Sequence, residues 1–296
     1  MIAALPSLQS WQHYPMGPAL RRFVGLPEAV GESSIPSAQE KLDFADALAV
    51  YLDATATLPE EAVLQELVQM DLPYAVYALS RENPHLALYR GLSAMLLGMW
   101  DEAEQAFCEA QRHNPGEPAP YSNLLYMWSC EENWAAMGPW IDTALAACPT
   151  HAPIWESVVG YCLREPGMET LQGYVEKAHS WMGACILTQV DADMTPEAKE
   201  ASLARFFHEG ERDPDFLIEY TALLGEQERY REIPPIVWQA EKLAKDPLPW
   251  QLGFHLAQAY IALGDGALYA QTRGKLLRNP RTPPSIHEMI PEDPFA

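Results

Sequence analysis

The strongest constraint on the fold is a short pattern that returns at regular intervals, an Asn, Asp or Cys followed by Pro. The pattern occurs at Asn83-Pro84, Asn114-Pro115, Cys148-Pro149, Asp213-Pro214, Asp246-Pro247 and Asn279-Pro280. Successive prolines are 31, 34, 65, 33 and 33 residues apart, and the step of 65 equals about two units with one proline missing. A period in this range indicates supersecondary units stacked side by side, so the chain is predicted to form a solenoid.

The central part of the chain keeps a stricter register. Gly91 to Pro115 has the pattern of a helix, a tight turn and a second helix, with small residues where two helices must approach closely. Three pairs of like residues are each separated by 34 residues: Trp100 and Trp134, Ala110 and Ala144, and Pro115 and Pro149. The same step places Trp155 opposite Tyr121 near the start of a first helix, and Ala178 opposite Ala144.

These residues resemble the tetratricopeptide repeat family, whose unit is a helical hairpin with a period of about 34 residues. The best match is GMWDEAEQAFCEAQRHNP from Gly98 to Pro115, and the second is LAQAYIALGD from Leu256 to Asp265. The resemblance covers about residues 50–280 and is partial in the other units. It implies an all-α fold, an α-solenoid of antiparallel helix pairs stacked into a right-handed superhelix.

The predicted domain organisation has three parts. Residues 1–36 form a Pro/Gly-rich N-terminal arm or cap, whose aromatic residues Trp11, Tyr14 and Phe23 should lie along the first helices. Residues 37–280 form the repeat domain, with about six to seven helical hairpins that are clearest at 85–182 and 248–280. Its first helix should begin with a capping box at Ser37 and Glu40. Residues 281–296 are expected to be an extended, Pro-rich C-terminal tail.

Composition limits the classes of partner. The 296 residues carry a net charge of −22 and have a pI near 4.6, which opposes the phosphate backbone and makes nucleic acid an unfavourable partner. No apolar run approaches the roughly 20 residues of a membrane span, and residues 1–8 lack the basic start of a secretory signal. The five cysteines form no dense framework and are expected to be reduced. A cytoplasmic location is therefore the expectation.

The sequence contains no recognisable catalytic or cofactor motif. A phosphate-binding glycine loop, a nucleophile elbow and an H-E-x-x-H pair are all missing from it. Cys148 and His151 have the nearest spacing to a metal site, but no second pair accompanies them. We therefore expect no enzyme activity, no metal and no cofactor.

The resemblance also implies where a ligand would bind. In this family the first helices line a concave groove, and the groove positions here are Leu88, Leu92, Met95, Ser122, Asn123, Tyr126, Ser129, Glu156, Gly160 and Leu163. Some family members hold a peptide's terminal carboxylate with Lys, Asn and Arg, and only Asn123 is near that pattern. The groove set has no positive charge, so an apolar or basic peptide suits it better. The alternative is that these residues only pack between units.

Three functions remain open at this stage. The leading hypothesis is a non-catalytic protein-interaction scaffold that binds a peptide segment of a partner in the concave groove. The second is a homo-oligomer joined through the solenoid ends or through the tail, whose apolar residues are Ile286, Met289, Ile290 and Phe295. The third is a cytoplasmic secretion-type chaperone for one exported protein.

Overall fold

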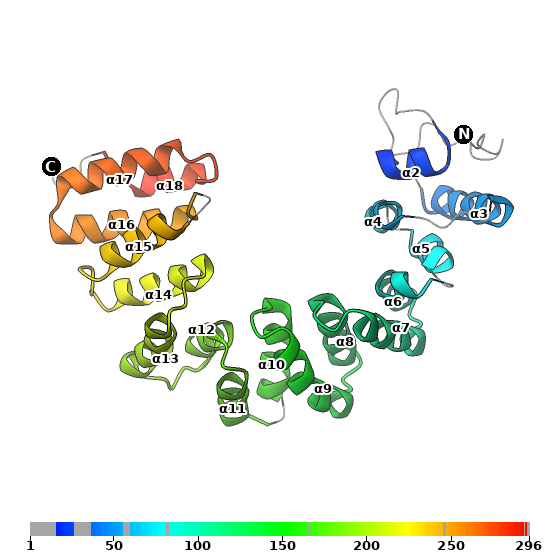
Figure 1. The fold of residues 1–296 in the computed structure, drawn as a ribbon, viewed down its shortest axis with the longest axis horizontal. Helices are drawn as coiled ribbons and strands as arrows, with labels where there is room; N and C mark the ends of the chain where they lie inside the picture. The colour runs from blue at the N-terminus through cyan, green and yellow to red at the C-terminus, as the bar shows by residue number, and fades with distance from the viewer. Residues whose placement is uncertain are drawn as a thin grey trace. The chain divides into compact units, whose positions relative to one another are not determined.

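A computed structural model describes residues 16–26, 37–55, 60–70, 72–80, 83–164, 166–244, 247–292 and 294. All regular secondary structure among these residues is helical. The chain divides into two compact units, Met1–Glu165 and Pro166–Ala296, each a succession of helices that pack against their neighbours along the chain (Figure 1). The predicted all-α solenoid is confirmed within each unit. Trp11, Tyr14 and Phe295 lie outside the described residues.

Unit 1 contains nine α-helices and one short 3-10 helix in its described residues. They are α2 (Pro18–Phe23), α3 (Ala38–Thr55), α4 (Glu61–Gln69), α5 (Pro73–Ser80), η1 (Pro84–Leu86), α6 (Ala87–Leu96), α7 (Trp100–His113), α8 (Pro118–Cys130), α9 (Trp134–Ala147) and α10 (Ala152–Arg164). The strict register of the sequence holds over four helices, because α7 and α9 each span 14 residues and α8 and α10 each span 13. The step from the start of α7 to the start of α9 equals the step from the start of α8 to the start of α10.

The turns inside the hairpins repeat one backbone conformation. Gly98, Glu132, Glu228 and Gly264 follow the first helices of four hairpins, and all have a positive φ, between 54° and 72°. The next residue in each case donates its N–H to a carbonyl five residues earlier, at 2.8 to 3.0 Å. This is the Schellman arrangement that satisfies the free carbonyls at a helix end. Glycine takes the conformation without strain, so Gly98 and Gly264 are the expected residue types and the two glutamates are not.

A second repeated feature anchors the first helices. The Tyr121 hydroxyl donates to the Pro115 carbonyl at 3.0 Å, and the Trp155 indole N–H donates to the Pro149 carbonyl at 2.7 Å. Donor and acceptor are both displaced by one repeat between the two hydrogen bonds, as the register predicts. Both side chains are buried, so each ring fills the core while its polar atom ties the helix to the proline turn before it.

Close packing explains why Gly91 is small. A Cβ atom added to Gly91 on α6 would lie 2.5 Å from Cε1 of Phe107 on α7. That distance is shorter than real carbon contacts allow, so a side chain at this position would push the two helices apart. The short run of small residues in the sequence therefore marks a real helix–helix contact.

Polar and apolar contacts hold the first described helices of unit 1, α2 and α3. Ser37 and Glu40 form the predicted capping box, with the Ser37 N–H donating to Glu40 at 2.8 Å and the Glu40 N–H donating to the Ser37 hydroxyl at 3.3 Å. Leu20 of α2 and Val24, the residue that follows α2, are fully buried in the core shared with α3, α4 and α5. The Glu66 carboxylate on α4 accepts the N–H groups of Ala19 and Leu20, at 2.9 and 2.8 Å.

Unit 2 contains eight α-helices in its described residues. They are α11 (Met168–Ala178), α12 (Trp181–Val190), α13 (Pro196–Glu209), α14 (Pro214–Glu226), α15 (Ile233–Leu243), α16 (Trp250–Leu263), α17 (Gly266–Arg278) and α18 (Pro284–Met289). Thr195 caps α13 by accepting the Ala198 N–H at 3.2 Å. Asp265 caps α17 in the same way, accepting the Leu268 N–H at 3.1 Å.

The C-terminal segment differs from the extended tail that its prolines suggested. Pro284 occupies the first turn of α18, where a missing N–H costs nothing, so proline starts this helix instead of preventing it. Ile286 and Ile290 are buried, and the Arg273 side chain of α17 donates to the Ile290 carbonyl at 3.0 Å. Among the described members of the predicted self-association set, only Met289 is exposed.

Candidate functional site

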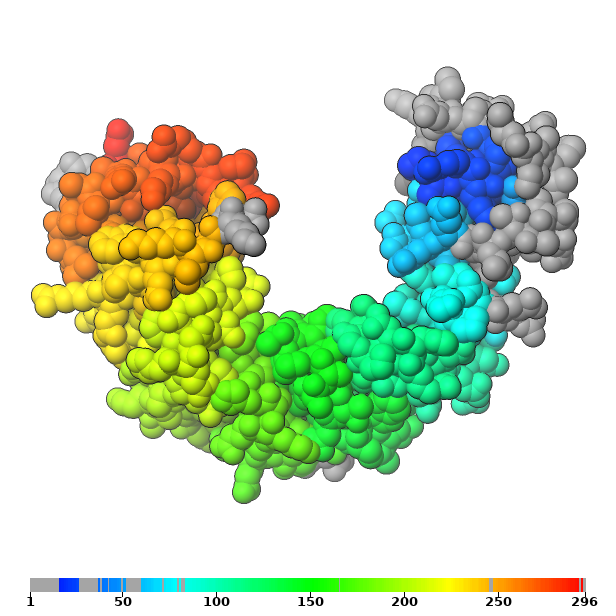
Figure 2. Space-filling model, in the orientation of Figure 1, coloured from blue at the N-terminus to red at the C-terminus, as the bar shows by residue number. Residues whose placement is uncertain are grey.

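The predicted groove residues of α8 and α10 line one hollow in unit 1. α8 and α10 pack side by side, and between them lies an open space of about 320 Å³. Its lining residues are Ser122, Asn123, Tyr126, Ser129, Pro153, Glu156, Ser157 and Gly160. We call this space the α8–α10 hollow. Side chains fill most of the gaps that the ribbon drawing leaves between neighbouring helices of each unit (Figure 2).

The other predicted groove positions do not line this hollow. Leu163 follows at the C-terminal end of α10 and is 62% exposed. Leu88, Leu92 and Met95 are half-buried on α6. The predicted set did not include Pro153 and Ser157. Ser157 occupies the same repeat position as Asn123, so the repeat could have indicated it, whereas Pro153 corresponds to Ala119, which is not in the predicted set.

Hydrogen bonds inside the helices decide which groups the hollow offers to a ligand. The Ser122 hydroxyl and the Asn123 amide both donate to the Ala119 carbonyl, at 3.1 and 2.8 Å, and the Ser157 hydroxyl donates to the Pro153 carbonyl at 3.1 Å. Both serine donors and one of the two Asn123 N–H donors are therefore used within the helix, while the three side-chain oxygens keep lone pairs that can accept hydrogen bonds. The hollow thus presents mainly hydrogen-bond acceptors.

Glu156 gives the hollow a negative charge. Its side chain is exposed and has no hydrogen-bond or ion-pair partner among the residues that the structure describes. No Lys or Arg lines the space, so nothing there compensates this carboxylate. A ligand that brings a cation or several N–H groups would therefore find matching charge and acceptors.

Tyr126 supplies the apolar part of the hollow. It is 58% exposed, so most of its ring is open to solvent and available to a ligand. The neighbouring Cys130, one helical turn further on, raises the pKa of Tyr126 through a hydrogen bond and through its charge when ionised. The phenol therefore remains neutral at physiological pH and can both stack on a ligand and exchange a hydrogen bond with it.

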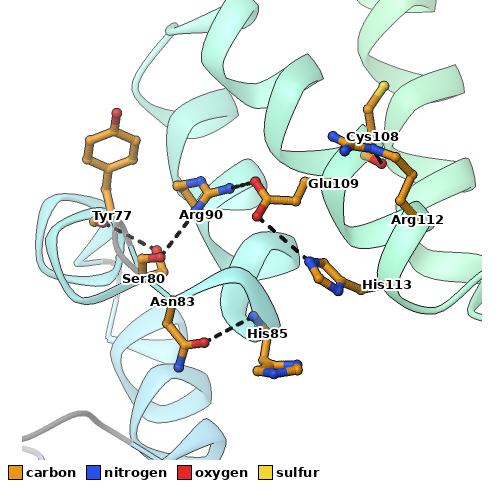
Figure 3. A network of polar contacts seen from close by, with 9 residues as sticks. All are labelled: Tyr77, Ser80, Asn83, His85, Arg90, Cys108, Glu109, Arg112 and His113. Carbon is orange, nitrogen blue, oxygen red and sulfur yellow. Dashed lines mark hydrogen bonds and ion pairs between the residues drawn. The ribbon is translucent and has the colours of Figure 1, made fainter.

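A polar network fixes α6, the helix before α8 on the same side of the hairpins. Arg90 on α6 lies between the end of α5 and α7, where it pairs with Glu109 and donates to the Ser80 carbonyl at 3.4 Å (Figure 3). Glu109 also faces His113, with 3.9 Å between the carboxylate and Nε2. The network joins three helices but leaves no cation free to hold an anionic ligand, because Glu109 neutralises Arg90.

The buried cysteines are poor candidates for chemistry. Burial raises the pKa of Cys162 to about 11 and that of Cys185 to about 12, so both remain thiols at neutral pH. All five cysteines are unbridged. Within the described residues, no three His, Cys, Asp or Glu side chains gather as metal ligands would. No helix in the same part of the chain has the length and apolar character needed to cross a membrane.

Unit 2 has its own hollow between first helices, and it contains a half-buried histidine. Residues of α14 and α16 enclose about 510 Å³, and there Nδ1 of His255 lies 2.8 Å from the Thr221 hydroxyl. Loss of water around the ring lowers the pKa of His255 from its ordinary value of 6.5, because burial disfavours the charged imidazolium.

His255 should therefore make unit 2 less stable in mild acid. The unfolded chain takes up a proton near pH 6.5, whereas the folded chain takes it up only at lower pH. The unfolded state then binds more protons, so stability is full above this pH, falls as the pH drops below it and levels off below the folded pKa. Urea unfolding of wild type and His255→Gln at a series of pH values measures this. We expect a shallower loss in His255→Gln, and identical pH profiles would contradict the assignment.

The chain shows little similarity to known proteins. No protein-family model matches it, and the search of curated proteins returned no match. Among solved structures, one described as the functional characterization of pilF from Pseudomonas aeruginosa is similar in fold, with 15% sequence identity and a TM-score of 0.39. The match covers 71% of this chain and 97% of that chain. A likeness of this size supports no statement about function.

Proposed function

We propose that the protein is a non-catalytic interaction scaffold and that the α8–α10 hollow binds a peptide segment of a protein partner. One observation carries the proposal: an open space lined by acceptors, an unpaired carboxylate and an exposed tyrosine. Tyr126 is 58% exposed, so its ring presents apolar surface within the hollow. A ligand that covers the ring would gain binding energy by removing that surface from water.

The lining residues define the chemistry of the bound segment. A Lys or Arg side chain of the peptide pairs with Glu156, and peptide N–H groups are accepted by the Asn123 carbonyl oxygen and the serine hydroxyls. An apolar or aromatic side chain next to the cation covers Tyr126. The volume of about 320 Å³ lies at the lower end of the range for ligand pockets, which suits two or three side chains of a peptide and not a whole folded domain.

Selection from a random peptide library on the immobilised full chain tests the proposal. We expect the selected peptides to share a basic residue close to an aromatic or large apolar one. A parallel selection on the Tyr126→Lys variant should lose this consensus. The substitution removes the aromatic ring, and the added positive charge repels the cation of the peptide. Selection of the same consensus on both proteins, or no enrichment on the wild type, would contradict the proposal.

Tyr74→Lys serves as the matched control for this selection. Tyr74 on α5 is 60% exposed, almost the same as Tyr126, and it does not line the α8–α10 hollow. Both variants change the net charge by the same amount and remove a surface tyrosine from unit 1. The control should therefore select the same consensus as the wild type.

A further inference from the structure

Unit 2 has a second hollow, larger than the one around His255 and lined by residues of α15, α16 and α17. It encloses about 830 Å³ between the end of α15, the residues before α16, and the C-terminal half of α17. We call this space the α15–α17 hollow. Its lining residues are Val237, Glu241, Ala244, Pro247, Leu248, Pro249, Trp250, Gly253, Leu256, Thr272, Lys275, Leu276, Arg278, Asn279, Pro280 and Arg281.

The lower part of this hollow is apolar. Val237, Leu256 and Leu276 come from three different helices and are buried in its floor, while Trp250 is half-buried at the start of α16. Gly253 lets the Leu276 side chain pack directly against α16, because a Cβ atom there would lie 2.9 Å from it. Buried aliphatic residues beside a partly exposed Trp form a surface that releases water when a side chain of similar size covers it.

The rim of the same hollow is cationic. Lys275, Arg278 and Arg281 line it, against the single carboxylate of Glu241. This balance is the reverse of the whole chain, which has 41 Asp and Glu against 19 Lys and Arg. The charge of the hollow is therefore opposite in sign to the net charge of the chain.

Two of the three cations remain uncompensated. Lys275 pairs with Glu241 at 3.0 Å. The Nε of Arg278 donates to the Gly274 carbonyl of its own helix at 2.8 Å. No carboxylate among the described residues forms an ion pair with Arg278 or Arg281, although the chain has an excess of acidic side chains. Guanidinium groups bind carboxylates in a two-pronged geometry, so both rim positions suit an acidic ligand.

We propose that the α15–α17 hollow is a second binding site, which takes an acidic segment of a protein partner. One large apolar side chain of the segment covers Trp250, Leu256 and Leu276, and flanking carboxylates pair with Arg278 and Arg281. A peptide fits this combination because it carries both kinds of group on adjacent residues. The α8–α10 hollow has an uncompensated carboxylate and no cation, so the two sites select segments of opposite charge and this proposal does not depend on the first.

Fluorescence anisotropy with three labelled peptides tests the second site on the full chain. The first probe has a central Leu-Phe pair flanked by Glu residues, the second has Lys in place of every Glu, and the third has Ala-Ala in place of Leu-Phe. With Tyr126→Lys as the protein, which removes binding at the α8–α10 hollow, the Glu probe should bind at least about ten-fold more tightly than either of the other two. Equal affinities for the Glu and Lys probes, or no measurable binding of the Glu probe, would overturn the proposal.

A charge-reversal pair locates the binding. Arg278→Glu with Arg281→Glu should weaken the Glu probe by at least about ten-fold. Arg231→Glu with Lys242→Glu is the matched control, because both residues are exposed on unit 2 and do not line the hollow. The two double variants change the net charge by the same amount. The control should retain nearly all the affinity. Equal losses in the two double variants would show attraction to the overall charge alone and would overturn the site.

A labelled single-stranded DNA separates an acidic peptide from a general polyanion. DNA carries the charge but lacks a free aliphatic side chain for the apolar floor, so it should bind more weakly than the Glu probe. Tighter binding of the DNA at equal salt would assign the hollow to a nucleic acid and would overturn the proposal.

Discussion

Replacing Trp155 by Ala is expected to lower the free energy of unfolding of unit 1 by about 3–5 kcal/mol, the usual cost of removing a buried aromatic side chain. Trp155 is fully buried on α10, so its truncation to Ala leaves a cavity in the core. Urea unfolding followed by circular dichroism measures the change.

Trp155→Phe separates packing from hydrogen bonding at the same position. The Phe ring retains most of the apolar contact but removes the 2.7 Å hydrogen bond to the Pro149 carbonyl, which should cost about 0.5–1.5 kcal/mol. Trp100→Ala is the control for a tryptophan in the same unit, since Trp100 is 37% exposed and should cost roughly 1–2 kcal/mol. Equal losses in Trp155→Ala and Trp100→Ala would contradict the repeat register as the source of stability.

Replacing Glu66 by Ala should release α2 from the rest of unit 1. The Glu66 carboxylate accepts two N–H groups at the start of α2, so its loss removes two charge-assisted hydrogen bonds worth about 2–4 kcal/mol together. Arg21 is 5% exposed and shielded from trypsin while α2 stays docked. Cleavage after Arg21 should accelerate by more than about ten-fold, because proteolysis follows the population of the open state.

Glu60→Ala is the matched control for this experiment. Glu60 precedes α4, is exposed, and makes no side-chain capping bond. It removes the same charge from the same region without touching α2, so cleavage after Arg21 should stay at the wild-type rate. A similar acceleration in both variants would mean that charge, and not the hydrogen bonds to Ala19 and Leu20, holds α2 in place.

The features that could be predicted from sequence are those that depend on local spacing. The constant repeat step placed Trp155 opposite Tyr121 and so predicted that α8 and α10 would be equivalent, whereas the groove positions Ser122, Tyr126 and Glu156 were implied by the family resemblance. The capping box is equally local: Ser37 and Glu40 lie one turn apart, and the side-chain types alone define the hydrogen bonds. Such contacts involve few residues and little tertiary context.

The features that could not be predicted depend on contacts between distant segments. Glu132 adopts a left-handed conformation that its residue type disfavours, because the surrounding hairpin fixes the turn. Pro284 starts a helix in a segment whose prolines suggested an extended chain, and the burial of Ile286 stabilises it. At the rim of the α15–α17 hollow, Lys275 pairs with Glu241, which is 34 residues away in the sequence. No local sequence pattern indicates how few carboxylates lie near Arg278.

Titration calorimetry with the peptide selected on the wild type tests peptide binding at the α8–α10 hollow most directly. We predict that Tyr126→Lys binds this peptide at least about ten-fold more weakly than the wild type, while Tyr74→Lys binds it with unchanged affinity. Equal affinity in Tyr126→Lys and Tyr74→Lys would contradict the assignment of the peptide site to this hollow.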